Sequence, residues 1–344
     1  MTTTAQEPTP SARPRPGSAG TAPVAIGGNA LVMDGESGDL GRQQRRAHVF
    51  AAQVADLVAM GWSVVVTHGN GPQVGFILRR GELVAAEAGI EGLPDLPLWL
   101  AVADSQGGIG HLVALALDDA SDDHGLGMGT VAVLTHVEVD PLDPAFASPT
   151  KPIGSTLTAE VARRRAAEEG WQVAETSAGV FRRVVPSPRP IRILEAPQIR
   201  TLVDSGATVI AAGGGGIPVV RDEHGWRGVD AVVDKDRASA VLAASAGVDT
   251  LVLVTAVDQV AIDFGTPQQR PIGEVSADEM RRHAAAGQFP PGSMGPKVEA
   301  ALRFLDSGGT RAVITSLPNL TAALRDGAGT HITSTVASGH PTQE

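Results

Sequence analysis

Residues 63–72 read SVVVTHGNGP, a short β-branched run followed at once by a glycine-rich turn. Such a run predicts a buried strand, and glycines placed directly after a strand let the backbone turn sharply and approach a ligand closely. A helical pattern precedes it, with Phe50, Val54 and Leu57 on one face and Gly61 as its stop. This alternation is typical of βαβ units built around a mostly parallel sheet.

The same alternation recurs along the chain and predicts an α/β fold with a mainly parallel central sheet. No segment of roughly 20 to 50 residues repeats, which disfavours solenoids and propellers. The other runs that predict strands are 24–26, 130–134, 208–212, 250–255 and 311–315.

Residues 1–21 are rich in Thr, Ser, Pro, Ala and Gly and are expected to be a disordered leader, and 336–344 a flexible tail. The proline-rich stretch 136–190 interrupts the sheet pattern. Its pieces 171–175 and 180–185 predict a hairpin within a small protruding subdomain. We find no secretory signal and expect no stretch to be long and apolar enough to cross a bilayer, which indicates a cytoplasmic protein.

Composition excludes several classes of function. The 344 residues include no Cys, which removes disulfides, thiolate nucleophiles and cysteine zinc sites. A net charge of −11 and an aromatic content of 3% disfavour nucleic acids as partners. The nine His form no zinc-protease motif, and Ser105 and Ser293 lack the setting of a hydrolase nucleophile.

Four glycine-rich turns are expected to follow predicted strands, at 27–29, 68–72, 213–216 and 292–297. At the carboxyl ends of parallel strands such turns expose backbone N–H groups that suit phosphate. Any one of them alone could be a tight turn without a ligand. None matches the P-loop or the dinucleotide fingerprint, so an ordinary P-loop NTPase or Rossmann dehydrogenase is disfavoured.

Lysine is scarce, and the chain contains only Lys151, Lys235 and Lys297. Lys235 lies between Asp234 and Asp236 at the predicted start of a helix, where an aspartate could simply cap the helix beside a solvated lysine. The alternative is that the lysines and N–H groups stabilise a phosphoryl group in transfer. That chemistry depends on positioning and electrostatics and requires no nucleophilic side chain.

The motifs together resemble the carbamate kinases, within the amino-acid kinase family. The similarity spans nearly the whole chain after the leader. It is carried by GGNAL at 27–31, HGNGPQVG at 68–75, SQG at 105–107, TKPIG at 150–154, RRVVPSP at 182–188, GGGGIPV at 213–219, DKD at 234–236 and GSMGPKV at 292–298.

This resemblance implies a three-layer αβα sandwich, usually dimeric, that interconverts ATP plus carbamate with ADP plus carbamoyl phosphate, in arginine metabolism. It implies a domain at 22–335, with an acceptor-side lobe at 22–207, the protruding subdomain at 136–190 inserted in that lobe, and a nucleotide-side lobe at 208–335. The implied partners are small-molecule substrates and a second copy of the chain, without nucleic acid or membrane.

The resemblance also implies roles for individual residues. The catalytic set is Lys235, Lys297, Asp236 and Lys151. The acceptor and the transferred group would lie against Gly27, Gly28, Asn29, Gly69, Asn70, Gly214 and Gly215. The nucleotide would lie against Asp234, Thr255, Val257, Val260, Met294, Gly295 and Lys297. Mg²⁺ is expected with ATP or ADP, held by phosphates and water rather than by side chains.

The sequence departs from the family pattern beside its SQG motif. Residues 98–104 read LWLAVAD, which places Asp104 at a normally apolar position. An amino-acid kinase relative acting on another small carboxylate, carbamate or phosphonate is therefore the alternative. A catalytically silent nucleotide-binding module is the second alternative, disfavoured by the complete set of lysines and aspartates.

Overall fold

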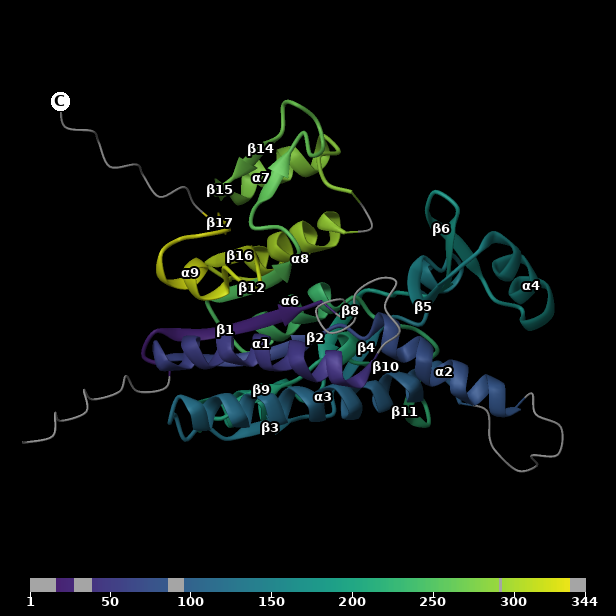
Figure 1. The fold of residues 1–344 in the computed structure, drawn as a ribbon, viewed down its shortest axis with the longest axis horizontal. Helices are drawn as coiled ribbons and strands as arrows, with labels where there is room; N and C mark the ends of the chain where they lie inside the picture. The colour runs from purple at the N-terminus through teal and green to yellow at the C-terminus, as the bar shows by residue number, and fades with distance from the viewer. Residues whose placement is uncertain (1–16, 28–38, 86–95, 291–292, 335–344) are drawn as a thin grey trace, which may run out of the picture.

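The computed structural model of the chain describes residues 17–27, 39–85, 96–290 and 293–334. Its largest sheet has eight strands (Figure 1). Their order across the sheet is β15 (Glu274–Ser276), β17 (Thr330–Thr333), β16 (Arg311–Ser316), β12 (Thr250–Thr255), β1 (Gly20–Ile26), β2 (Trp62–His68), β9 (Thr208–Ile210) and β3 (Thr130–Ala132).

All neighbouring strands in this sheet run parallel except β16 and β17. Val24 of β1 lies opposite Val66 of β2 on one side and Val252 of β12 on the other. The mainly parallel sheet predicted from the sequence is confirmed. Because β9 lies between β2 and β3, one continuous sheet runs through both of the lobes expected on either side of residue 207.

Helices cover both faces of the sheet. One face packs against α1 (Leu40–Ala59), α3 (Leu98–Asp123) and α9 (Leu320–Arg325), and Figure 1 shows α1 and α3 side by side. The other face packs against α5 (Ala196–Asp204), α6 (Lys235–Ser245), α7 (Ala277–Ala285) and α8 (Met294–Asp306).

Strand residues alternate between these two helical layers. Val64 and Val66 pack in the core that contains α1 and α3, whereas Val65 between them packs toward α5 and α6. Because side chains of a strand point to opposite faces in turn, an apolar run such as 63–67 must be covered on both sides. The structure confirms the three-layer αβα arrangement.

A four-stranded sheet adjoins the main sheet. Its order is β11 (Gly225–Gly228), β10 (Ile217–Asp222), β4 (His136–Val139) and β8 (Pro190–Ile193). The strands at the two ends of the predicted 136–190 subdomain, β4 and β8, pair with each other here. The chain between them leaves this sheet and returns to it.

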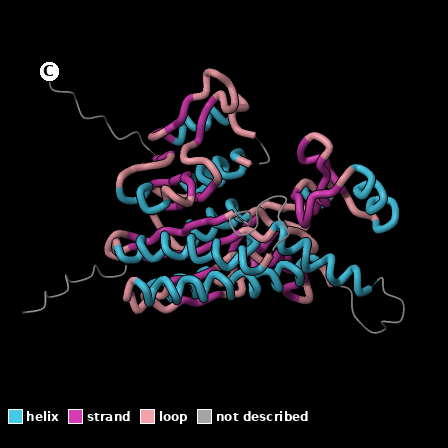
Figure 2. Tube along the Cα trace, in the orientation of Figure 1, coloured by secondary structure: helices cyan, strands magenta, loops and turns pink. Residues whose placement is uncertain are grey.

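That excursion contains a protruding unit, which we define as residues 151–185. It consists of β5 (Lys151–Leu157), α4 (Ala159–Glu169), β6 (Val173–Ser177) and β7 (Val180–Val185). The antiparallel β6–β7 hairpin matches the sequence prediction. Figures 1 and 2 show the unit projecting away from the body of the molecule.

The base of the protruding unit packs against α2 (Gly71–Ala85). Gly75 of α2 contacts Gly154 of β5 so closely that a Cβ on Gly75 would lie 2.1 Å from the Gly154 Cα. Ile153 is buried beside Val74 at the same point. These two glycines therefore allow β5 to start close to the end of β2, which brings Lys151 back toward the main sheet.

A short antiparallel pair follows β12. It consists of β13 (Val260–Ile262) and β14 (Arg270–Ile272), and it leads into β15 and α7. Figure 1 shows these elements on the far side of α8 from the long helices α1 and α3. They extend the part of the chain that the resemblance assigns to the nucleotide.

The expectation that no stretch is long and apolar enough to span a bilayer is wrong for α3, judged by length and composition alone. Half of that apolar window is buried inside the protein. Ile109, Val113 and Leu117 of α3 pack on α1 and the sheet. The high apolar content of α3 therefore reflects its place in the core.

Candidate active site

Three of the glycine-rich turns meet at one edge of the main sheet. Because β1, β2 and β9 are parallel, the residues that follow them, Gly27, Gly69 and the 213–216 loop, lie at the same edge. Gly69 N–H donates to Ile26 O over 3.0 Å, which ties the turn after β2 to the end of β1. Gly28, Asn29 and Gly292 lie outside the described residues.

The loop 213–216 has a backbone that few sequences could adopt. Ala212, Gly214, Gly215 and Gly216 all have positive φ, between 49° and 89°. The left-handed conformation is costly for alanine, and Ala212 is held there by a 3.0 Å hydrogen bond from its N–H to Thr135 Oγ1. Because Ala212 keeps this unfavourable left-handed conformation, the contacts around the loop must determine its shape.

Close packing explains why glycine occupies the rest of this loop. A Cβ on Gly213 would lie 2.5 Å from His68 Nε2, and one on Gly214 would lie 2.2 Å from Asn70 Nδ2. On Gly215 it would lie 2.3 Å from Val233 O. The loop is therefore pressed between the turn that follows β2 and the strand-like segment that leads into α6.

Helix α6 begins at this edge, and its first residues carry the predicted charges. Asp234 is the N-cap, since its Oδ1 accepts from the N–H groups of Asp236 and Arg237 over 3.0 and 3.3 Å. The capping role considered from the sequence is thus real. Lys235, however, is not a solvated neighbour, because its side chain is only 9% exposed.

The structure brings all three lysines of the chain to this helix start. Lys235 Nζ lies 2.5 Å from Asp236 Oδ1, and Lys297 Nζ lies 3.1 Å from Asp236 Oδ2. From the other side, Lys151 Nζ lies 2.6 Å from Asp234 Oδ2. We call these five residues the lysine cluster: Lys151, Asp234, Lys235, Asp236 and Lys297.

Electrostatics distinguish the members of this cluster. Burial lowers the pKa of Lys235. The positive charge of Lys297 lowers this pKa further, whereas the Asp236 carboxylate raises it. Burial alone would raise the pKa of Asp234, but Lys151, Lys235 and the Arg237 N–H hold it well below its usual range. Three ammonium groups face two carboxylates, which leaves one positive charge unbalanced in a largely buried place. An anion bound there would balance it.

Polar residues that the site assignments did not include surround the glycine loop. Gln106 of α3 is buried, and its side chain donates to Gly213 O over 2.9 Å and to Thr135 O over 3.1 Å. It also accepts from the Thr135 N–H over 2.9 Å. The Gln106 side-chain amide thus links α3 both to Thr135, which follows β3, and to the glycine loop. These hydrogen bonds hold the loop in its position.

His68 and Ser105 complete this polar layer. His68 is buried, and its burial lowers its pKa to about 4 despite a 3.1 Å hydrogen bond between Nδ1 and Gly69 O. Ser105 Oγ lies 2.9 Å from Asn70 Nδ2. The motif HGNGPQVG drew attention to His68, and SQG to Ser105 and Gln106, but no spacing rule connects the two motifs. Asp104, by contrast, is exposed on the outer side of α3.

The residues predicted for the nucleotide occupy two neighbouring segments. Thr255 ends β12, Val257 follows it, and both are partly exposed. Met294 and Gly295 begin α8, where a Cβ on Gly295 would lie 2.9 Å from Pro290 O. Val260 differs, because its side chain is fully buried and its N–H donates to Thr330 Oγ1 over 2.9 Å. It therefore packs beneath these segments instead of forming their surface.

The donor set of the site does not favour a metal held by side chains. Among the described residues, no three His, Asp or Glu side chains come together as metal ligands would. The carboxylates of Asp234 and Asp236 are already bound by ammonium groups and helix N–H groups. A divalent cation here would have to be held by oxygen atoms of the bound substrates and by water.

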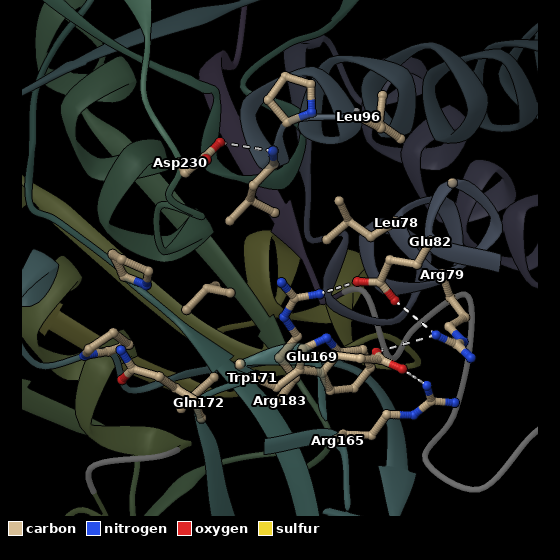
Figure 3. Close-up of a pocket in the computed structure, with 18 of the residues that line it drawn as sticks. Leu78, Arg79, Glu82, Leu96, Arg165, Glu169, Trp171, Gln172, Arg183 and Asp230 are labelled. Atoms are coloured by element: carbon tan, nitrogen blue, oxygen red, sulfur yellow. Dashed lines mark hydrogen bonds and ion pairs between the residues drawn. The ribbon is translucent and has the colours of Figure 1, made fainter. Parts of the chain in front are cut away.

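A cavity of about 1360 Å³ lies between α2 and the protruding unit. Figure 3 shows a group of ion pairs across it, which we call the arginine network: Arg79, Glu82, Arg165, Glu169 and Arg183. Arg165 and Arg183 also lie over the Trp171 ring. Each arginine of this network faces a carboxylate, and the glycine loop does not line the cavity.

Comparison with known proteins supports one family. The sequence profile of the amino acid kinase family matches residues 24–316. The carbamate kinase-like protein YahI of Escherichia coli K12 is 46% identical over 314 residues, which are 91% of this chain and 98% of that protein. The carbamate kinase of Pyrococcus horikoshii is 41% identical over 310 residues, which are 90% of this chain and 98% of that protein.

Solved structures agree with these sequences. The carbamate kinase of Giardia lamblia, solved with citric acid and with AMP-PNP, is 37% identical, and the match covers 92% of this chain and 99% of that one. The TM-scores are 0.86 and 0.83. The residues matched by the family profile, 24–316, include the glycine loop and the whole lysine cluster. The chain therefore belongs to the amino acid kinase family, in the branch that contains the carbamate kinases.

Proposed function

We propose that this protein is a carbamate kinase, which transfers a phosphoryl group reversibly between ATP and carbamate to give ADP and carbamoyl phosphate. The observation that carries the proposal is the lysine cluster, with three lysines from distant segments converging on Asp234 and Asp236 beside a glycine loop. The names of the relatives favour carbamate over the other small acceptors considered from the sequence.

Electrostatic stabilisation is the proposed source of catalysis. A phosphoryl group in transfer spreads negative charge over its three equatorial oxygens. Lys235 and Lys297 are assigned to this charge, Asp236 holds both ammonium groups in place, and Gly214 and Gly215 are assigned to the position beside the transferring group. The acceptor oxygen attacks phosphorus directly as the bond to the leaving oxygen breaks, so no covalent enzyme intermediate forms.

The acceptor end is assigned to the edge formed by the turns after β1 and β2. We assign Gly27, Gly69 and Asn70 to it, while Gly28 and Asn29, which are also predicted for the acceptor, lie outside the described residues. Lys151 reaches this edge from the protruding unit and is fixed by Asp234 at 2.6 Å. We assign Lys151 to the carboxylate of carbamate or to the phosphate that it receives.

The nucleotide is assigned to the segments that end β12 and begin α8. Thr255, Val257, Met294 and Gly295 form its surroundings, with Asp234 and Lys297 at its phosphate end and Val260 packed below. Mg²⁺ would accompany the nucleotide, neutralise part of its phosphate charge, and be held by phosphates and water. The AMP-PNP complex of the Giardia lamblia enzyme supports a nucleotide site in this fold.

We further propose a cytoplasmic homodimer that has no nucleic acid or membrane partner. The absence of Cys and the net charge of −11 support this location and these exclusions. Exposed apolar side chains on α3 and near the edge strand β3, namely Leu100, Leu115, Val131 and Leu134, support an interface there.

The test is a coupled assay that follows ATP formed from ADP and carbamoyl phosphate with Mg²⁺. We expect turnover that depends on both substrates, and ADP release in the reverse direction with carbamate. ADP release only with another carboxylate or a phosphonate would favour the alternative acceptor. Binding of ADP without turnover of any acceptor would favour a silent nucleotide-binding module.

A further inference from the structure

Ser105 contacts Asn70 in a way that fixes which end of the Asn70 amide faces the acceptor. We propose that Ser105 is a positioning residue, which holds the Asn70 carbonyl oxygen toward the acceptor so that it accepts a hydrogen bond from the amino group of carbamate or carbamoyl phosphate. This inference rests on the proposed function and adds to it a means of selecting the acceptor.

The orientation follows from counting hydrogens. Ser105 Oγ lies 2.6 Å from Val102 O, and a carbonyl oxygen can only accept, so the single hydroxyl hydrogen of Ser105 is donated to it. Ser105 Oγ can then only accept from Asn70 at 2.9 Å. The Asn70 atom that faces Ser105 must therefore be the nitrogen of the side-chain NH₂ group.

Packing prevents the amide from turning over freely. Asn70 is only 2% exposed, and its amide lies flat against Gly214, where even a Cβ would come within 2.2 Å of Nδ2. In the described part of the chain, no hydrogen bond reaches the Asn70 side-chain oxygen, and this oxygen is not among the fully buried atoms that lack a partner. It is therefore open to a donor from a ligand or from water.

The oxygen end and the NH₂ end of this amide suit different ligands, because the oxygen accepts a hydrogen bond and the NH₂ group donates one. The amino group of carbamate or of carbamoyl phosphate carries N–H donors, which an amide carbonyl accepts. Acetyl phosphate has nearly the same shape but presents a methyl group at that position and offers no donor. A site built to accept this hydrogen bond disfavours the analogue that cannot make it, because the Asn70 side-chain oxygen then loses this partner.

The experiment compares two phosphoryl donors to ADP, carbamoyl phosphate and acetyl phosphate, through the ratio of their kcat/KM values. We expect Ser105→Ala to lower this ratio about tenfold, mainly through carbamoyl phosphate, because the amide then loses the hydrogen bond that sets its orientation. Ser105→Thr retains the hydroxyl and should restore most of the ratio. Ser121→Ala removes another buried hydroxyl of α3, bonded to the Met128 N–H, and should leave the ratio unchanged.

Two results would overturn the inference and are distinguishable. If the unaltered protein uses both donors but Ser105→Ala slows them equally, Ser105 has only a structural role and the proposed function stands. If the unaltered protein makes no ATP from carbamoyl phosphate, the proposed function fails, and this inference fails with it. Thermal unfolding of each variant shows whether any loss of rate reflects loss of the fold.

Discussion

The lysine cluster and the arginine network contain the same charges, three cations and two carboxylates, yet they lie in different surroundings. In the lysine cluster the side chains are between 4% and 27% exposed, and they lie at the carboxyl edge of the main sheet. In the arginine network they are between 19% and 30% exposed, under a unit that projects from the body (Figure 3).

The difference shows that a tally of charges does not identify a phosphate site. Burial removes Lys235 from water and lowers its pKa, whereas the network arginines stay partly hydrated. The glycine loop packs against the segment that leads into the lysine cluster, whereas it does not line the cavity of the arginine network. Lysine is also a compact charge that can follow a moving phosphoryl group, while arginine suits fixed pairing with carboxylates.

The largest expected effect tests whether the lysine cluster is catalytic. Lys235→Met or Lys297→Met should each lower kcat for ATP formation by about 10²–10³-fold, because each removes one charge from the transferring group. Arg183→Met removes a cation from the arginine network and should change kcat less than about threefold. Steady-state kinetics on the three folded variants measures kcat. An equal loss of kcat in Arg183→Met would show that the lysine cluster has no special role in catalysis.

A second prediction tests the glycine loop. Gly214→Ala would place a Cβ 2.2 Å from Asn70 Nδ2 and should lower kcat/KM about 10- to 100-fold, because a small displacement of the acceptor site is costly. Gly179→Ala is the matched control, since Gly179 also has positive φ, at 74°, but a Cβ there meets nothing within 4 Å.

Both of these alanine variants should lose about 1–2 kcal/mol of unfolding free energy through left-handed backbone strain. Only Gly214→Ala should lose activity. Urea unfolding and kinetics on the same samples separate the two effects, and full activity in Gly214→Ala would show that the loop does not position the acceptor.

The smallest expected effect concerns the arginine network. Glu82→Gln removes the carboxylate shared by Arg79 and Arg183, whose side chains are 30% and 27% exposed. Because partly exposed ion pairs are weak, the free energy of unfolding should fall by less than about 1 kcal/mol, and less still at high salt. Catalytic rates should stay within about twofold. A large loss of rate would mean that this network controls the active site.

Much of the fold was predictable from local pattern. All six predicted strands are present, and the β6–β7 hairpin was placed correctly within the protruding unit. The error on α3 has a simple cause, because an apolar helix buried beneath a sheet and one suited to a membrane have similar composition. Helix α3 is explained only by its packing against α1.

The site was predictable in part. Lys151, Lys235 and Lys297 could be selected because lysine is rare in this chain and each lies in a glycine, proline or aspartate setting. Gln106 and Ser105 received no role, because serine and glutamine in an apolar helix carry no signal of their contacts. Val260 was expected at the nucleotide surface, but the side chain of this strand residue points into the core.

The sequence by itself determined the types of element, the turns that require glycine and the few residues able to stabilise a phosphoryl group, because backbone preference and hydrophobic period are local properties. Only the tertiary structure decided that Lys151 meets Asp234 across 83 residues and that Lys297 meets Asp236 across 61. Those contacts depend on which strands become neighbours in the sheet, and that choice is set by burial of the whole core.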